Sequence, residues 1–408
     1  MFNSFCRHDL RRGATFVICL ICALVGGTNA DAANAALPYG CELANATPSI
    51  APDARAAPPI FPPVQLQVRT PVEPTVLPSD GKNYLIYELH LHNFSTEPLT
   101  VQSIEVLDAD RPTTPVVAGI KGKQLGESLR KVTIGEHQGS SQQLGVGEGA
   151  VAFLCLAFDA TTPVPLTLKH RIRLDQSVAE GSPIKTRTTP LHVLGRPLVG
   201  ANWTPDNNPS LYSHHRMGLW VVGGDAGISR RYAIDWKKYD DEGKTYAGDP
   251  RDVHAYYAYG QKVLAVADGT VVEARDGFPD NIPKTEAGFD PARPVTLDTI
   301  GGNQVIIDVG GGQFAAYFHL QPGSIAVKAG DRVRRGQPVG RIGNSGDARW
   351  PHLHFQLTDK ADAMASEGLP HVFDSYRVQT GNQQWKMRTA EYPMGKVVID
   401  FGADTVNR

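Results

Sequence analysis

Two histidines separated by one residue, His352 and His354, are the side chains in this sequence best placed to do chemistry. They lie in the alternating run WPHLHFQL, residues 350–357, which predicts a β-strand. Because strand side chains alternate between two faces, His352, His354 and Gln356 share one face, and apolar side chains occupy the other. A glycine-rich turn, GRIGNSGDARW at 340–350, leads into the run. The pattern predicts two imidazoles presented to a groove.

Three further stretches hold residues that could act together with His352 and His354. Asp235 ends the strand-like run RYAID, His319 lies in YFHL, and GNSG occupies residues 343–346. One aspartate and three histidines on a β scaffold are the ingredients of a zinc hydrolase, because zinc takes imidazole nitrogen and carboxylate oxygen and keeps one position for water. Zinc lowers the pKa of that water, and nearby histidines can accept its proton.

In this order, over about residues 215–360, the stretches resemble the lysostaphin-type zinc metalloendopeptidases, which cut peptide cross-bridges or stems of bacterial peptidoglycan. The most specific part is AGDRVRRGQPVGRIGNSGDARWPHLHF. The resemblance implies a β-rich peptidase domain and one Zn²⁺ per chain. It also implies that Asp235 and His354 are zinc ligands, that His352 is the catalytic histidine beside the metal, and that His319 is the second catalytic histidine.

One position departs from the family pattern H-x-x-x-D, since Arg231 stands where the first histidine is expected. Arginine has no lone pair to give to a metal. If residues 231–235 form a strand, Arg231 shares a face with Asp235 and could pair with it, which would give a metal-free, peptidoglycan-binding or hydrolase-activating module. Alternatively another histidine supplies the third ligand, with His215 or His214 the best candidates and His254 the third. We favour an exported zinc-dependent metalloendopeptidase acting on peptidoglycan or peptide.

The sequence holds a second H-x-H pair, His90 and His92, in the run NYLIYELHLHNF. No acidic or glycine-rich motif accompanies this pair. We interpret the run as a structural strand, with Glu88 and the two histidines on one face and leucines on the other.

The remaining sequence predicts a mainly β protein. Short alternating runs between turn residues indicate an antiparallel β-sandwich over 64–185, which could contact an envelope protein. We assign an inter-domain linker to 186–213, the peptidase domain to 214–360 and an irregular tail to 361–408. The long segment 276–302, between two expected strands, is interpreted as a flap beside the groove.

The N-terminus has the pattern of an export signal. Three arginines precede an apolar segment that is too short for a comfortable membrane span and is followed by small residues. This predicts a signal peptide over 1–32, a Pro/Ala-rich linker over 33–63, export to the periplasm or the outside, and no membrane span in the mature chain.

The two cysteines left in the mature chain, Cys41 and Cys155, either pair in an oxidising compartment or remain free, with Cys155 buried. The net charge of −2 gives no reason to expect a nucleic-acid partner.

Overall fold

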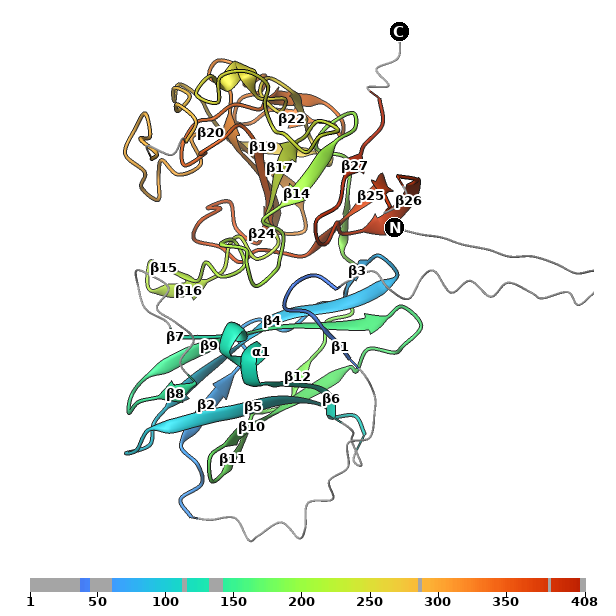
Figure 1. Cartoon of the computed structure of the whole chain (residues 1–408). Coiled ribbons are helices and arrows are strands. Elements are labelled where there is room, and N and C mark those ends of the chain that lie inside the picture. Colours follow the sequence, from blue (N-terminus) through green and yellow to red (C-terminus); the bar gives the residue numbers. More distant parts are fainter. Residues whose placement is uncertain are drawn as a thin grey trace, which may run out of the picture. The chain divides into compact units, whose positions relative to one another are not determined.

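Nearly every regular element of the chain is a β-strand (Figure 1). The computed structural model describes residues 37–44, 61–111, 116–131, 142–284, 288–380 and 383–403. The predicted signal peptide, with Cys6, Cys19 and Cys22, and most of the predicted linker lie outside these residues. Within the described ranges no helix has the length and apolar character to cross a membrane. The mainly β fold class is confirmed.

The N-terminal strands form two sheets. The first has the order β1 (Glu42–Leu43), β9 (Gly149–Asp159), β4 (Lys82–Asn93), β2 (Leu66–Arg69), with β3 (Leu77–Ser79) on β4 and β7 (Leu129–Lys131) on β9. The second has the order β11 (Val178–Glu180), β10 (Thr167–Leu174), β5 (Leu99–Asp108), β6 (Val116–Lys121), with β12 (Ile184–Lys185) on β10 and β8 (Gln143–Leu144) on β5. The helix α1 (Gly122–Ser128) follows β6. Strands of both sheets contribute to one hydrophobic core, so the sheets pack against each other.

Strand β4 is buried on both faces. Leu85, Tyr87 and Leu89 lie in the core between the two sheets. Ile86 points the other way, into the core of the C-terminal half, and Glu88 is on that same face and only 3% exposed. The alternation expected from the sequence is therefore present, and β4 links the two cores.

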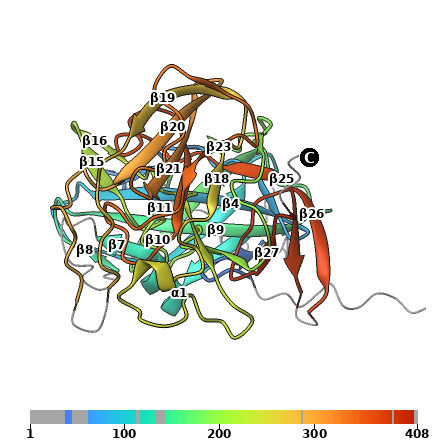
Figure 2. The ribbon, with the colours of Figure 1, turned by 90° about the horizontal axis from the view of Figure 1, so that it is seen from above.

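The C-terminal half is built on one large sheet. Its order is β13 (His192–Leu194), β25 (His371–Gln379), β27 (Ile399–Asp400), β14 (Trp203–Asp206), β17 (Ile234–Lys238), β24 (Leu353–Thr358), β21 (Gln313–Leu320), β20 (Asn303–Gly310), β19 (Gly269–Arg275), β22 (Arg332–Val333). Strand β26 (Trp385–Glu391) pairs with β25. Figure 2 shows β19, β20 and β21 side by side. Two short pairs complete the half, β15 (Trp220–Val222) with β16 (Asp225–Gly227) and β18 (Lys262–Leu264) with β23 (Pro338–Arg341).

Two stretches expected to be irregular carry strands instead. The tail after residue 360 forms β25, β26 and β27, because alternate side chains of β25, among them Tyr376 and Val378, are buried in the main core. The stretch 186–213 contributes β13 and β14, and the indole of Trp203 in β14 is completely buried. Burial against remote strands gives these segments their structure.

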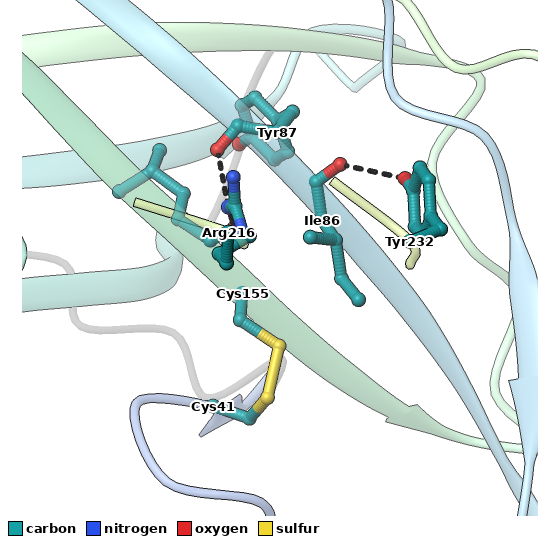
Figure 3. The surroundings of a disulfide bond; sticks show 7 residues. Cys41, Ile86, Tyr87, Cys155, Arg216 and Tyr232 are labelled. Carbon is teal, nitrogen blue, oxygen red and sulfur yellow. Dashed lines mark hydrogen bonds between the residues drawn. A yellow bond between two sulfur atoms is a disulfide. The ribbon is translucent and has the colours of Figure 1, made fainter. Parts of the chain in front are cut away.

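The two cysteines of the mature chain form a disulfide, Cys41–Cys155 (Figure 3). Cys41 precedes β1, which pairs with β9 in parallel, and Cys155 lies within β9 opposite Ile86 of β4. The pairing favours the first of the two alternatives that the sequence left open.

Candidate metal centre

Three neighbouring strands bring the chemistry-bearing residues together. Strand β24 lies between β17 and β21 in the large sheet. Asp235 of β17 is directly opposite His354 of β24, and His354 is in turn opposite Phe318 of β21. His319 is the next residue of β21, and His352 immediately precedes β24. The sheet register thus places Asp235, His319, His352 and His354 around one point.

The loop after β14 adds a further histidine. Asn207, at a positive φ of 55°, donates a hydrogen bond from Nδ2 to Asp235 Oδ2 at 2.6 Å. Its backbone carbonyl accepts a hydrogen bond from Nδ1 of His215 at 3.1 Å. This loop therefore turns the buried imidazole of His215 toward Asp235.

Three imidazole nitrogens surround a single carboxylate oxygen, Oδ1 of Asp235. Nδ1 of His354 is 2.9 Å away, Nε2 of His352 is 3.3 Å away and Nε2 of His215 is 3.5 Å away. The Asp235 side chain is only 6% exposed. Such a dense set of polar atoms is costly to bury unless a cation or protons connect them.

The other ring nitrogens show where the histidine protons lie. His215 Nδ1 faces the carbonyl of Asn207, His352 Nδ1 faces that of Trp350 at 2.6 Å, and His319 Nδ1 faces that of Ser345 at 2.9 Å. A carbonyl can only accept, so each Nδ1 carries the hydrogen. In the neutral form of each imidazole, Nε2 is left with a lone pair.

Gln356 fixes the opposite tautomer for His354. Its Nε2 donates to the backbone carbonyl of Ala363 at 2.9 Å, which leaves Oε1 to accept from His354 Nε2 at 2.8 Å. His354 Nδ1 therefore holds a lone pair and lies 2.9 Å from a carboxylate oxygen. Two acceptors this close repel each other unless a cation lies between them, so the donor set fits a metal ion.

Burial keeps His215 and His319 neutral. Burial lowers the pKa of His215 and of His319 well below the ordinary value. Burial raises the pKa of the Asp235 carboxyl, but its histidine neighbours, His215 foremost, outweigh burial and hold that pKa well below the usual range. Neutral imidazoles and an ionised carboxylate are the forms that bind Zn²⁺.

His319 is held in an unusual backbone conformation. Its φ is +65°, a region that L residues seldom adopt. Two remote glycines support it: His319 N donates to the carbonyl of Gly301 at 2.9 Å, and Gly343 N donates to that of His319 at 3.0 Å. A Cβ added at Gly346 would lie 2.5 Å from the nitrogen of Gly302, so the GNSG turn needs glycine there to pack closely beside Gly301 and Gly302.

An open cavity of about 560 Å³ gives access to these groups. Lys284 and Ile300, from the segment 276–302, are among its lining residues, as expected for a flap beside the groove. His214 also lines the cavity, and one of its ring nitrogens lies within 4.8 Å of ligand atoms of His215 and Asp235, although its side chain is exposed. His254 is not among the residues that line the cavity. Its side chain is 72% exposed and bonded to Asp252.

Comparison with known proteins shows that part of this site is similar to a peptidase family. Residues 252–366 match the family described as Peptidase family M23. This part of the chain is therefore similar to peptidase family M23. The resemblance to lysostaphin-type peptidases is thereby confirmed.

This chain is similar to curated proteins that have the names of cell-wall enzymes. It is 45% identical over 206 residues to "Peptidoglycan DD-endopeptidase ShyA" of Vibrio cholerae serotype O1, a match covering 47% of this chain and 43% of that protein. It is 34% identical over 110 residues to "Glycyl-glycine endopeptidase ALE-1" of Staphylococcus capitis, covering 27% of this chain and 24% of that protein. The chain thus spans less than half of the length of these two curated relatives. A solved structure, the catalytic domain of lysostaphin from Staphylococcus simulans, is 20% identical with a TM-score of 0.22, covering 43% of this chain and 88% of that one.

The M23 match includes only part of the site. His319, His352 and His354 lie inside residues 252–366, whereas His215 and Asp235 precede that range. The part of the site outside the match is also where the chain departs from the H-x-x-x-D pattern at Arg231.

Arg231 does not pair with Asp235, and the expectation that it could was wrong. It lies in a turn before β17, which begins at Ile234, so strand alternation does not place it on the face of Asp235. Its Nε and Nη2 are each 3.0 Å from Glu88 Oε2, and Nη1 is 2.8 Å from Glu367 Oε2. The metal-free module therefore loses the contact on which it was based.

Sequence reasoning missed the residues that orient the site. Asn207 was assigned to a linker, although it holds both Asp235 and His215. Gln356 was placed on the correct face of the strand but received no role. The polar run NNPS around Asn207 was the available sign, since Asn readily adopts the positive φ that such a turn uses.

Proposed function

We propose that this chain is an exported zinc-dependent metalloendopeptidase that hydrolyses peptide bonds in peptidoglycan, in the periplasm or outside the cell. The observation that carries the proposal is the convergence of three imidazole lone pairs on Asp235 Oδ1, with each opposite ring nitrogen bonded to an acceptor of the protein. In a metal site, contacts of this kind orient the ligands and fix which ring nitrogen has the lone pair.

His215, Asp235 and His354 are the residues that would hold the zinc. Each is buried and each has a second contact that fixes its orientation, from Asn207 for the first two and from Gln356 for the third. When bound, zinc supplies Lewis acidity, which makes water more acidic and polarises a peptide carbonyl. Arg231 takes no part in this set, because both of its ion pairs are with glutamates.

His352 is the proposed general base. Its Nδ1 hydrogen is fixed on the Trp350 carbonyl, so Nε2 faces the centre with a lone pair that can accept a proton from the attacking water. The same proton can then be passed to the leaving amine.

His319 stands beside His352, with ring centroids 4.9 Å apart. In its neutral form Nε2 is an acceptor, so His319 orients the attacking water. It can stabilise an oxyanion only after it has gained a proton, because an acceptor nitrogen repels negative charge.

The substrate class is supported by the curated relatives, whose names specify peptidoglycan or a glycyl-glycine bond. The predicted signal peptide supports export, and the Cys41–Cys155 disulfide is consistent with an oxidising compartment.

Metal analysis combined with peptidoglycan digestion tests the proposal. The purified protein is expected to hold about one zinc per chain and to release soluble peptides from purified peptidoglycan, and a chelator should stop the release. His354→Ala should lose both zinc and activity, whereas His352→Ala should keep zinc and lose activity. A folded protein that holds no zinc and leaves peptidoglycan intact would favour a binding or regulatory module instead.

A further inference from the structure

Arg230 lines the same cavity, yet its surroundings differ sharply from those of Arg231. The neighbouring Arg231 forms ion pairs with Glu88 and Glu367. Arg230 has a buried Nε without a hydrogen-bond partner, and among the described residues it forms no ion pair. A half-buried guanidinium without an acidic partner is costly, so an arrangement that retains one suggests an anion supplied from outside the chain.

Neighbouring residues fix the position of the Arg230 side chain. Its guanidinium carbon lies 5.1 Å from the centre of the Trp220 ring, a distance at which a cation is attracted to an aromatic face. A Cβ added at Gly218 would lie 3.0 Å from Arg230 Nη2 and 3.2 Å from Trp220 Nε1, so the absence of a side chain there makes room for the guanidinium beside the indole. The group is held at the cavity wall before any ligand arrives.

Charges around the cavity favour a negative ligand. The lining residues include four cationic side chains, Arg230, Lys237, Lys284 and Arg349, and two carboxylates, Asp235 and Asp347, a balance of 4 − 2 = +2. Lys237 is bonded to Asp206 at 2.9 Å, and Arg349 lies 3.6 Å from Asp347. Asp235 is committed to the histidines. Arg230 is therefore the lining arginine whose charge is not matched by a carboxylate in contact with it.

We propose that Arg230 binds a carboxylate of the substrate, so that the site selects peptides with a free carboxylate close to the bond that is cut. This rests on the proposed function, and it specifies the chemistry of the peptide. A guanidinium matches a carboxylate in geometry and can form two parallel hydrogen bonds with it. Because the guanidinium is already positioned by Trp220, little conformational freedom is lost when the substrate binds.

Binding measurements separate this role from hydrolysis. Peptidoglycan fragments are prepared in their native form and after carbodiimide coupling with ammonia, which converts carboxylates to carboxamides. Their affinity for the full chain is measured by calorimetry in the His352→Ala background, so that fragments are not cut during the titration. Native fragments should bind roughly 10- to 100-fold more tightly than amidated ones, the range expected for charged hydrogen bonds.

Arg230→Gln should remove this preference, and Arg230→Lys should retain only part of it because lysine lacks the paired donors. Arg293→Gln is the matched control, since Arg293 also lies over an aromatic ring, that of Phe278, but is exposed and does not line the cavity. It should leave the ratio unchanged. If Arg230→Gln and Arg230→Lys fold, bind zinc and keep the parent's preference, the proposal is overturned.

The outcomes also separate this inference from the proposed function. Carboxylate preference that depends on Arg230, in a protein without zinc or hydrolysis, would support the binding role and reject the enzyme. Zinc-dependent hydrolysis without any preference between native and amidated fragments would support the enzyme and reject the role of Arg230.

Discussion

Arg231 is bonded to Glu88, 143 residues earlier in the chain, and not to Asp235, four residues later. Glu88 lies on β4 of the first N-terminal sheet and also forms an ion pair with the buried Arg216. Nη2 of Arg216 donates to the carbonyl of Tyr87 (Figure 3) and to that of Leu154. Arg216 directly follows His215, and Arg231 precedes Asp235. One carboxylate of the N-terminal half thus holds two of the three chain segments that deliver ligands to the candidate metal centre, those of His215 and Asp235.

Glu88→Ala should destabilise the protein strongly. The change leaves the guanidinium groups of Arg216 and Arg231 buried without Glu88, and breaking a buried ion pair costs about 3–5 kcal/mol. Denaturant unfolding measures the loss. Asp159→Ala is the control, because its pair with Lys82 is exposed and should contribute less than about 1 kcal/mol. Equal, small losses for both variants would show that Glu88 does not anchor these segments.

Arg231→His should not create a zinc ligand. The side chain at this position points toward Glu88 and Glu367, so the imidazole would replace two ion pairs and would not reach Asp235. We expect a lower free energy of unfolding and no increase in zinc per chain, measured by denaturant titration and metal analysis. A parent without zinc and a variant with one zinc per chain would contradict this expectation.

His215→Ala should reduce zinc content, whereas His254→Ala should not. His215 Nε2 faces Asp235 Oδ1, and His254 is exposed and bonded to Asp252. Metal analysis after dialysis against zinc-free buffer distinguishes the two variants. Zinc retained in His215→Ala but lost in His214→Ala would transfer the ligand role to the neighbouring histidine.

Gln356→Leu should weaken zinc binding about 10- to 100-fold, since a partner that orients a ligating histidine has an effect of that size. Without the amide oxygen, His354 is free to move its hydrogen to Nδ1 and lose the lone pair directed at Asp235. Competition with a chromophoric chelator gives the affinity. Gln313→Leu is a matched control, because Gln313 also contacts a histidine, His192, but does not line the cavity.

Acid should destabilise the N-terminal sheets through His170. Burial lowers the pKa of this imidazole to about 3, and its Nε2 contacts the Tyr87 hydroxyl at 2.9 Å. Between pH 6.5 and pH 3 the unfolded chain takes up a proton that the folded chain does not, so stability falls as the pH falls, by up to about 1.4 kcal/mol per pH unit from this group. His170→Gln should flatten the decline of the unfolding free energy between pH 6 and pH 4. Parallel profiles for parent and variant would remove His170 as the cause.

Local pattern predicted the faces of strands but not their remote partners. Alternation in WPHLHFQL correctly placed Leu353 and Phe355 in the core and His354 opposite them. The same reasoning failed for Arg231, because the segment before Ile234 is a turn and its ionic partner is far away in the sequence. The strands of the tail were missed for a similar reason: their burial comes from packing against a core that the local sequence does not reveal.

The register that sets Asp235 opposite His354, and His354 opposite Phe318, has a consequence for how such a chain can vary. Side chains repeat every two residues along a strand, so adding or deleting one residue within β24 would turn His354 into the core and bring an apolar neighbour to the cavity. Loops such as 276–302 carry no such constraint on their length. In β17, β21 and β24 the number of residues is therefore as restricted as their identity, and natural insertions should be confined to the connections between these strands.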